Sequence, residues 1–381
     1  MDKNTNENKF IWKLLVKWLS PLVRLRFNIT NDSYTEEGPC LIISNHVSSW
    51  DPIFAAMSFP NAPVHFVASE HLFRKRFLSW LLEYFIAPIP RRKASSAADT
   101  VMKCLRRLKA GQMVGLFAEG EASWDGVNID VFSATGKMAR TSGATLITYR
   151  IEGGYLTLPR WSRKIRRGKI HGHIVGVYPP AELKKMKPEE ISALINRDIY
   201  EDAWERQRSE HVKFKSKAPA DGIECGFFIC PKCGGIDTVK GEADRVSCSC
   251  GWNVQYTEEG FLQPAQPFET LREWNLWQRE KFESMSFAPG ELMFSDEGME
   301  FKEIDADHGE KVFGAVTLRQ YPEGIECGEH RFEYADIGYM SMVKRNILLF
   351  TVGDRYFELR TKEKKCIRKY LFAWEKFNSE K

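Results

Sequence analysis

The sequence lacks a charge-free apolar run of about 18 residues or more, so we expect no membrane-spanning helix. The unbroken apolar core and small-residue cleavage site of a secretory signal are also missing. Internal repeats and low-complexity tracts are absent as well. Hydrophobic residues make up 43% of the 381 positions and charged residues 28%. This composition is typical of a folded, water-exposed protein with two or three domains.

The sequence has little excess of one charge sign, since its formal net charge is only +4. Such a small excess does not by itself indicate a nucleic-acid partner, which requires a concentrated basic face. The nine cysteines are an odd number, and several of them crowd between residues 225 and 250. An odd, clustered set indicates a reducing compartment and a metal site, and argues against a secreted disulfide framework.

Residues 10–26 have the pattern of a basic amphipathic helix, which we expect to kink or break near Pro21. Such a helix either lies in the headgroup plane of a membrane or packs on its own domain. One side carries Ile11, Leu14, Leu15, Trp18 and Leu22, and the other carries Lys13, Lys17, Ser20 and Arg24.

The next part of the chain alternates between predicted strands and helices, which indicates an α/β layer architecture with a central mixed sheet flanked by helices. The apolar segment 74–90 either lines an acyl pocket, touches lipid or forms an ordinary buried helix. We predict strands over 40–44, 64–68, 113–117 and 144–149, a helix over 97–109, and a further helix from Lys187 to about His211.

The C-terminal part has a different character. Helical spacing over 270–285 is followed after Pro289 by period-two strands, with a turn at Gly353-Asp354 and a closing amphipathic helix. This order of elements resembles a pleckstrin-homology-like domain. We predict an α/β domain over 1–214, a linker over 215–222, a zinc ribbon over 223–260, a helical connector over 261–288 and a β-rich domain over 289–381.

The segment SNHVSSWD is the strongest candidate for catalysis. His46 and Asp51 are five positions apart directly after a predicted buried strand, and a turn or helix start would bring them together. Imidazole suits proton transfer from a hydroxyl near neutral pH, and a carboxylate on its other nitrogen would fix the tautomer. We therefore predict His46 as a general base and Asp51 as the residue that orients it.

Candidate substrate contacts lie around the same strand ends. In LFAEGEASWDG, Glu119 could hold acceptor hydroxyls or a positioning arginine, while Gly120 lets a ligand approach the backbone. In PIPRR, Arg91 and Arg92 could make bidentate contacts to a phosphate, or could belong to a solvated turn. Asn45, next to His46, completes the predicted substrate-binding set.

Together these motifs resemble the glycerophospholipid acyltransferase family, of which bacterial lysophosphatidate acyltransferases are the nearest type. NHVSSWD corresponds to the family's N-H-x4-D block, PIPRR to its arginine block, FAEGEAS to its F-P-E-G-T-R-S block and TLITYRI to a later apolar block. The resemblance covers residues 10–211. It implies attack of a lysolipid or glycerol-phosphate-like hydroxyl on an acyl-CoA or acyl-carrier-protein thioester, without a metal in the chemistry.

The sequence departs from that family in its third block. Ala122 stands where an arginine usually helps bind the acceptor phosphate, and Glu121 replaces threonine. Either Arg91, Arg92 or the basic run 160–169 supplies the missing charge, or the acceptor is not a phosphomonoester. The basic run itself has two interpretations, a membrane-surface patch or a solvated loop.

The motifs CPKCG and VSCSCGW predict one structural zinc ion held by Cys230, Cys233, Cys248 and Cys250, with Cys225 as an alternative ligand. We expect a peripheral enzyme on the cytoplasmic face of a membrane, whose partners are the lipid surface, the lysolipid and the acyl donor, and no nucleic acid. The alternative is a non-catalytic adaptor that keeps the acyltransferase fold for lipid binding and uses its C-terminal parts to bind proteins.

Overall fold

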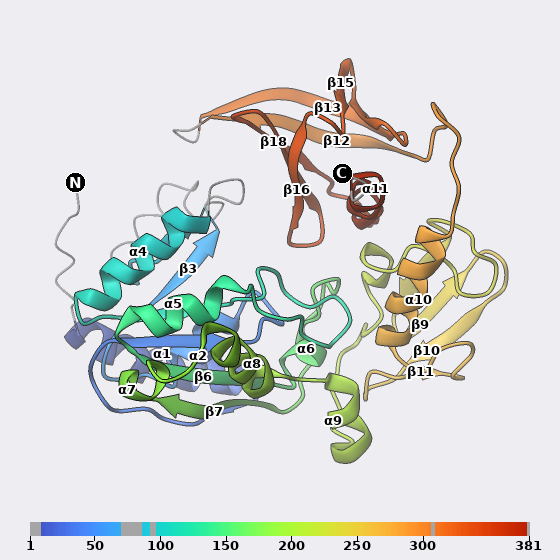
Figure 1. Cartoon of the computed structure of the whole chain (residues 1–381). Coiled ribbons are helices and arrows are strands. Elements are labelled where there is room, and N and C mark those ends of the chain that lie inside the picture. Colours follow the sequence, from blue (N-terminus) through green and yellow to red (C-terminus); the bar gives the residue numbers. More distant parts are fainter. Residues whose placement is uncertain (1–8, 70–85, 92–96, 306–308, 379–381) are drawn as a thin grey trace. The chain divides into compact units, whose positions relative to one another are not determined.

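The structure, a computed structural model, describes residues 9–69, 86–91, 97–305 and 309–378. It divides into two compact units (Figure 1). Unit 1 comprises Met1–Pro159 and Ile165–Ser216, and unit 2 comprises Arg160–Lys164 and Lys217–Lys381. The short segment 160–164 therefore interrupts unit 1 in sequence and belongs to unit 2.

Unit 1 is built on a seven-stranded mixed sheet with the strand order β1-β7-β6-β2-β5-β3-β4. Its neighbouring strands are parallel, except that β7 runs antiparallel to β6. The predicted α/β class is thus correct. The strands are β1 (Ile29–Asn31), β2 (Cys40–Ser44), β3 (Val64–Ser69), β4 (Ile89–Arg91), β5 (Met113–Leu116), β6 (Thr145–Glu152) and β7 (Ile170–Tyr178).

Helices cover both faces of this sheet. Leu41 and Ile43 point toward α4, α5 and α8, where they join a buried apolar cluster. On the other face, α1 and α2 meet through Phe27 and Phe54, whose ring centroids are 5.1 Å apart. The helices are α1 (Lys9–Phe27), α2 (Asp51–Ala56), α4 (Ala97–Lys109), α5 (Ala134–Ser142), α6 (Gly154–Thr157), α7 (Pro180–Leu183), α8 (Pro188–Ile199) and α9 (Ala203–Glu210).

Helix α1 buries only a narrow stripe of its surface against the rest of unit 1. Trp12 is 5% exposed and donates its indole N–H to the Phe59 carbonyl at 2.9 Å. Of the kink or break predicted near Pro21, the break is wrong, because the helix continues through this residue. Ser20, predicted on the polar side, is buried. The outward face carries Phe10, Leu14, Trp18, Leu22 and Leu25, which are 39–71% exposed.

Unit 2 combines two antiparallel sheets with helices α10 (Leu271–Glu283) and α11 (Arg368–Asn378). The smaller sheet has the order β11-β10-β9-β8, formed by β8 (Val239–Glu242), β9 (Arg245–Cys248), β10 (Asn253–Tyr256) and β11 (Leu262–Gln263), and the short helix η2 (Ile223–Cys225) precedes it. The larger sheet has the order β15-β14-β13-β12-β18-β17-β16. Its strands are β12 (Phe294–Ile304), β13 (Glu310–Gln320), β14 (Gly324–Cys327), β15 (His330–Glu333), β16 (Ile337–Val343), β17 (Ile347–Val352) and β18 (Arg355–Arg360).

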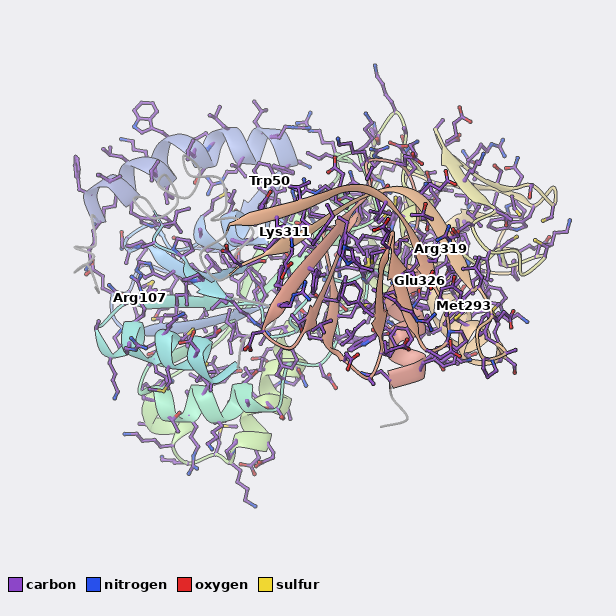
Figure 2. All side chains as sticks on the ribbon, turned by 90° about the horizontal axis from the view of Figure 1, so that it is seen from above. Trp50, Arg107, Met293, Lys311, Arg319 and Glu326 are labelled. Carbon is purple, nitrogen blue, oxygen red and sulfur yellow. The ribbon has the colours of Figure 1, made fainter. Side chains whose placement is uncertain are left out.

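The larger sheet agrees only partly with the strand predictions. The strand pair joined at Gly353-Asp354 is confirmed as β17 and β18. The stretch 331–343, in which apolar and polar residues alternate, forms two strands separated by a turn after Glu333. Strand β15 pairs with β14, and β16 pairs with β17. Strands β12 and β13 were not predicted. In the structure β13 pairs with β14, and Arg319 of β13 lies opposite Glu326 of β14 (Figure 2).

Three further expectations differ from the structure. The helix predicted from Lys187 to His211 is two helices, because the Asp202 carboxylate accepts two backbone N–H bonds and starts α9 anew. The stretch 219–222, expected within a linker, is buried. The basic run 160–169 is only partly at the surface, since Trp161 and Arg166 are at most 1% exposed while its other basic residues are exposed or half-buried.

Candidate active site and metal centre

The predicted pair His46 and Asp51 lies together beyond the C-terminal end of β2. Their side chains meet at 2.7 Å between His46 Nδ1 and Asp51 Oδ2. Asp51 is the first residue of α2 and is completely buried. The chain between strand and helix is therefore short enough to place a carboxylate directly on the imidazole, as the spacing predicted.

Asp51 is held by more than the histidine. Its carboxylate accepts the backbone N–H groups of Val47 and Ser48 at 2.7 and 2.8 Å, and the Ser48 hydroxyl at 2.7 Å. A buried carboxylate with four donors is well compensated for the loss of water. Such a carboxylate can fix His46 in the tautomer that carries its proton on Nδ1.

The imidazole of His46 stacks on Phe117, with ring centroids 4.6 Å apart and planes inclined by 26°. Phe117 in turn stacks on Phe66 at 5.6 Å. The His46 side chain is 23% exposed, so one edge remains open to a ligand. Since Asp51 takes Nδ1, Nε2 is the ring nitrogen left to receive a proton.

Asn45 does not face a ligand. It is 0% exposed, and its side-chain amide pairs in both directions with the backbone of Ile151. The Asn45 Nδ2 donates to the Ile151 carbonyl at 3.1 Å, and Oδ1 accepts the Ile151 N–H at 2.7 Å. Asn45, predicted as a substrate contact, thus connects the ends of β2 and β6 through these two hydrogen bonds.

Glu119 lies beneath His46 and is only 3% exposed. One carboxylate oxygen accepts the backbone N–H of His46 at 2.7 Å, and the other accepts that of Ile129 at 3.1 Å. Burial raises the pKa of Glu119 to about 8, although these two N–H donors oppose the shift. Glu119 therefore holds the backbone of His46, a contact that the sequence motif did not reveal.

Gly120 and Arg91 both lie near the aromatic ring of Phe132. Gly120 has φ +84°, and a side chain there would meet Phe132 at 2.7 Å, so a glycine is required. The guanidinium of Arg91 lies 5.9 Å from the centroid of that ring. Arg92 falls outside the described residues. The structure thus brings Arg91 close to the Gly120 turn.

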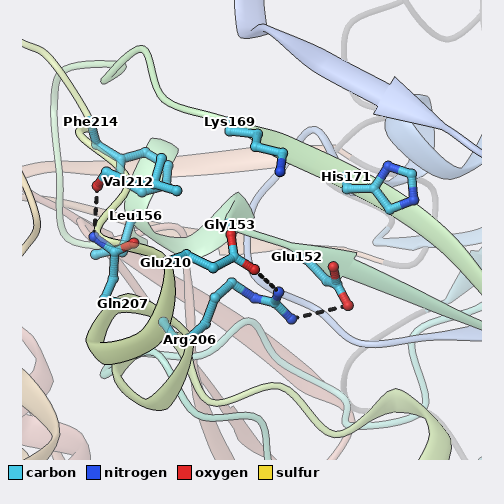
Figure 3. Close-up of a pocket in the computed structure, with 11 residues that line it drawn as sticks. Glu152, Gly153, Leu156, Lys169, His171, Arg206, Gln207, Glu210, Val212 and Phe214 are labelled. Atoms are coloured by element: carbon cyan, nitrogen blue, oxygen red, sulfur yellow. Dashed lines mark hydrogen bonds and ion pairs between the residues drawn. The ribbon is translucent and has the colours of Figure 1, made fainter.

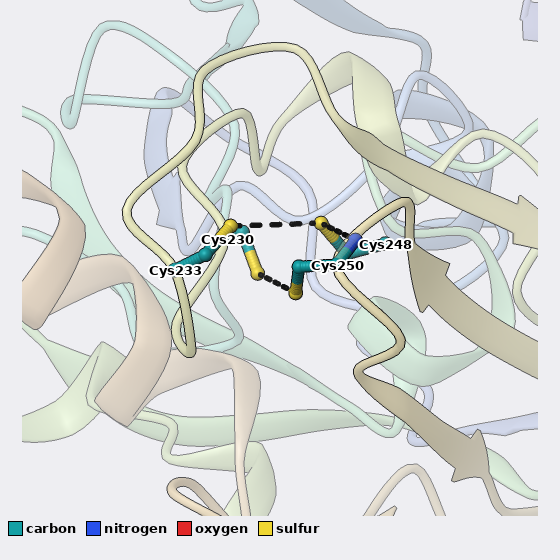
Figure 4. Close-up of side chains that lie close together, drawn as sticks. All are labelled: Cys230, Cys233, Cys248 and Cys250. Atoms are coloured by element: carbon teal, nitrogen blue, oxygen red, sulfur yellow. Dashed lines mark hydrogen bonds between the residues drawn. The ribbon is translucent and has the colours of Figure 1, made fainter.

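The four predicted zinc ligands, Cys230, Cys233, Cys248 and Cys250, come together between two turns of unit 2 (Figure 4). Sγ–Sγ distances are 3.9 Å between Cys230 and Cys250 and 3.8 Å between Cys233 and Cys248. Tetrahedral zinc with bonds of about 2.3 Å places its sulfurs about 3.8 Å apart, so these thiols fit the ion. Cys225 is not part of this four-cysteine group.

The loop between the cysteine pairs also reaches the C-terminal helix of the same unit. Asp237, four residues after Cys233, pairs with Lys369 of α11, which is 1% exposed. Lys369 also contacts Asp296 of β12 at 2.8 Å. A buried ammonium needs such partners, because an unpaired charge in the interior is costly. A metal that orders this loop would therefore also stabilise α11.

Comparison with known proteins gives two findings. Residues 26–152 match the family model described as Acyltransferase. Among solved structures, the 1-acyl-sn-glycerophosphate (LPA) acyltransferase PlsC from Thermotoga maritima is similar, with a TM-score of 0.45 and 18% sequence identity. That similarity covers 55% of this chain and 85% of the other.

The raised pKa of Glu119 predicts a pH-dependent stability. Between its ordinary pKa of 4.5 and about 8, the folded state binds more protons than the unfolded state, so stability falls as pH rises through this window. The slope is at most about 1.4 kcal/mol per pH unit. The free energy of unfolding can be measured by hydrogen exchange of the β2 amides in wild type and in Glu119→Gln. We expect the value for wild type, relative to that for the variant, to decrease from pH 5 to pH 8. A difference that stays constant would contradict the raised pKa.

The cysteine geometry predicts one tightly held zinc ion per chain. Its removal by a chelator should increase hydrogen exchange in β8, β9 and α11, because the loop carrying Asp237 loses its anchor. Metal quantification and exchange of the full chain would check this, with the strands of unit 1 as the internal control. Unchanged protection of α11 after complete metal loss would contradict the coupling.

Proposed function

We propose that the chain is an O-acyltransferase acting at a membrane surface, and the match of residues 26–152 to the Acyltransferase family model supports this proposal. It transfers a fatty acyl group from acyl-CoA or acyl-carrier protein to the hydroxyl of a lysophosphatidate-like acceptor. The observation that carries this proposal is the 2.7 Å contact between His46 and a completely buried Asp51. A lipid-binding adaptor would need no such base.

In this mechanism His46 Nε2 removes the proton from the acceptor hydroxyl while Nδ1–H donates to Asp51. The acceptor oxygen attacks the thioester carbonyl carbon, and a tetrahedral intermediate forms. When the intermediate collapses, the carbon–sulfur bond breaks, and the departing thiolate takes the proton from His46 Nε2. The products are an oxygen ester and a free thiol, and the imidazole returns to its starting state.

Arg91 is the described residue best suited to contact an acceptor phosphate in place of the arginine missing at Ala122. Arg91 is the last residue of β4, and both Arg91 and Gly120 lie near the ring of Phe132. Guanidinium groups bind phosphate oxygens in a bidentate manner. This assignment favours a phosphomonoester acceptor over an uncharged one.

Helix α1 supports binding to a membrane surface. Its outward face exposes Trp18 by 68% and Leu22 by 63%, whereas large apolar side chains usually gather into protein contacts. Exposed Lys13 and Lys17 flank that face and would be attracted to anionic lipid headgroups. No helix among the described residues is long and apolar enough to span a bilayer. We therefore propose that α1 lies in the headgroup plane.

The catalytic proposal predicts that His46→Ala lowers acyl transfer at least about 100-fold, because the general base is lost. The measurement is transfer of radiolabelled acyl groups from acyl-CoA or acyl-carrier protein to a panel of lysolipids. His330→Ala, an exposed histidine of unit 2, is the matched control and should keep full activity. Full activity of His46→Ala would overturn the mechanism, and an inactive wild type that still binds liposomes would favour the adaptor.

The membrane proposal predicts that the double variant Trp18→Glu, Leu22→Glu reduces binding to liposomes containing anionic lipid at least about tenfold. Both side chains are exposed, so the fold should remain intact. Met102→Glu on α4, where the native side chain is 53% exposed, is the matched control. Equal sedimentation of both variants with liposomes would contradict a role for α1.

A further inference from the structure

A second group of potential metal ligands lies at the β1 edge of the unit 1 sheet, and the acyl-transfer mechanism does not use it. Asp32 directly follows β1, while His171 and His173 lie two positions apart on β7 and so point to the same face. Strands β1 and β7 are parallel neighbours, with Thr30 opposite His171. The sheet therefore holds all three side chains in one place.

The distances between the three side chains suit a shared ion. Asp32 Oδ2 lies 2.8 Å from His173 Nδ1, and Asp32 Oδ1 lies 3.4 Å from His171 Nε2. The three ligand atoms are all within 4.8 Å of one another. Nitrogen and oxygen ligands bound at about 2.0–2.2 Å lie about 3.0–3.5 Å apart around one ion, so small side-chain rotations would close the site.

Hydrogen bonds behind the three ligands support the same arrangement. The Thr30 hydroxyl lies 2.8 Å from His171 Nδ1, which fixes that ring and leaves Nε2 directed at Asp32. The backbone N–H of Ile174 donates to Asp32 Oδ2 at 2.9 Å and holds the carboxylate. Histidine ligands of metals are commonly oriented in this way through their second ring nitrogen.

We propose that Asp32, His171 and His173 bind one divalent transition-metal ion of the zinc, cobalt or nickel class. Two imidazoles and one carboxylate select such ions over magnesium and calcium, which prefer oxygen ligands alone. The side chains are 31–41% exposed, so water can occupy the remaining coordination positions. This site differs from the four-cysteine centre in its ligand atoms and in the unit that contains it.

A cavity of about 280 Å³ adjoins the proposed site, because His171 also lines it. Figure 3 shows His171 and Lys169 at one side of this pocket and Arg206 at the other. Arg206 is paired with Glu152 at 3.0 Å and with Glu210 at 2.8 Å. Of the three proposed ligands, only His171 is among the residues that line this pocket.

The test is a cobalt titration of the full-length, metal-free chain. Cobalt at the four-cysteine centre gives intense thiolate charge-transfer absorption, whereas cobalt with nitrogen and oxygen ligands gives only weak visible bands. We expect two equivalents per chain by equilibrium dialysis, of which only one shows the thiolate signal. The variants His171→Ala and His173→Ala should each weaken the second equivalent at least about tenfold and leave the thiolate signal unchanged.

Controls separate this site from adventitious binding. His330→Ala should keep both equivalents, and Cys233→Ser should disturb only the thiolate signal. Thr30→Val, which keeps the side-chain shape, should weaken the second equivalent without removing it. The proposal is overturned if wild type binds only the thiolate equivalent, or if the histidine variants bind the second equivalent as tightly as wild type does. Circular dichroism of each variant would confirm that the fold is retained.

Discussion

The interaction on which the active-site geometry depends is the buried carboxylate of Asp51, which accepts bonds from the imidazole and from the turn around it. Two further buried groups fix the backbone of the same turn. Glu119 holds the His46 N–H from below, and Asn45 ties the end of β2 to Ile151 of β6. The His46 imidazole is thus restrained through its ring nitrogen, through its own backbone and through the neighbouring Asn45. Such a side chain needs little reorganisation before it can accept a proton.

Elements with strong local patterns could be predicted from the sequence. The helix over 97–109 and the strand over 40–44 have the predicted bounds, because the first has helical spacing and the second is a short, continuously buried run. Other predictions failed, each for a different physical reason. The capping carboxylate of Asp202 divides a helical stretch that periodicity alone would continue. Strands β12 and β13 were missed, since their alternation of buried and exposed positions is irregular.

The same distinction applies to the candidate sites. The spacing of His46 and Asp51 is local, so their contact could be predicted, and so could the cysteine cluster with its tight pairs. The partners of Glu119 and Asn45 are backbone atoms 73 and 106 residues away, and no short motif encodes them. The contact between Asp32 and His173 spans 141 residues and required the β1–β7 pairing to be known.

The placement of segment 160–164 has a consequence for how the chain is made. Trp161 is fully buried within unit 2, against Tyr256, and the Arg160 guanidinium donates to the carbonyls of Met342 and Lys344. During synthesis these residues leave the ribosome well before the strands that enclose them. The indole therefore stays exposed to water until the chain has been made at least as far as Tyr256. A protein shortened to its first unit would carry that apolar surface permanently.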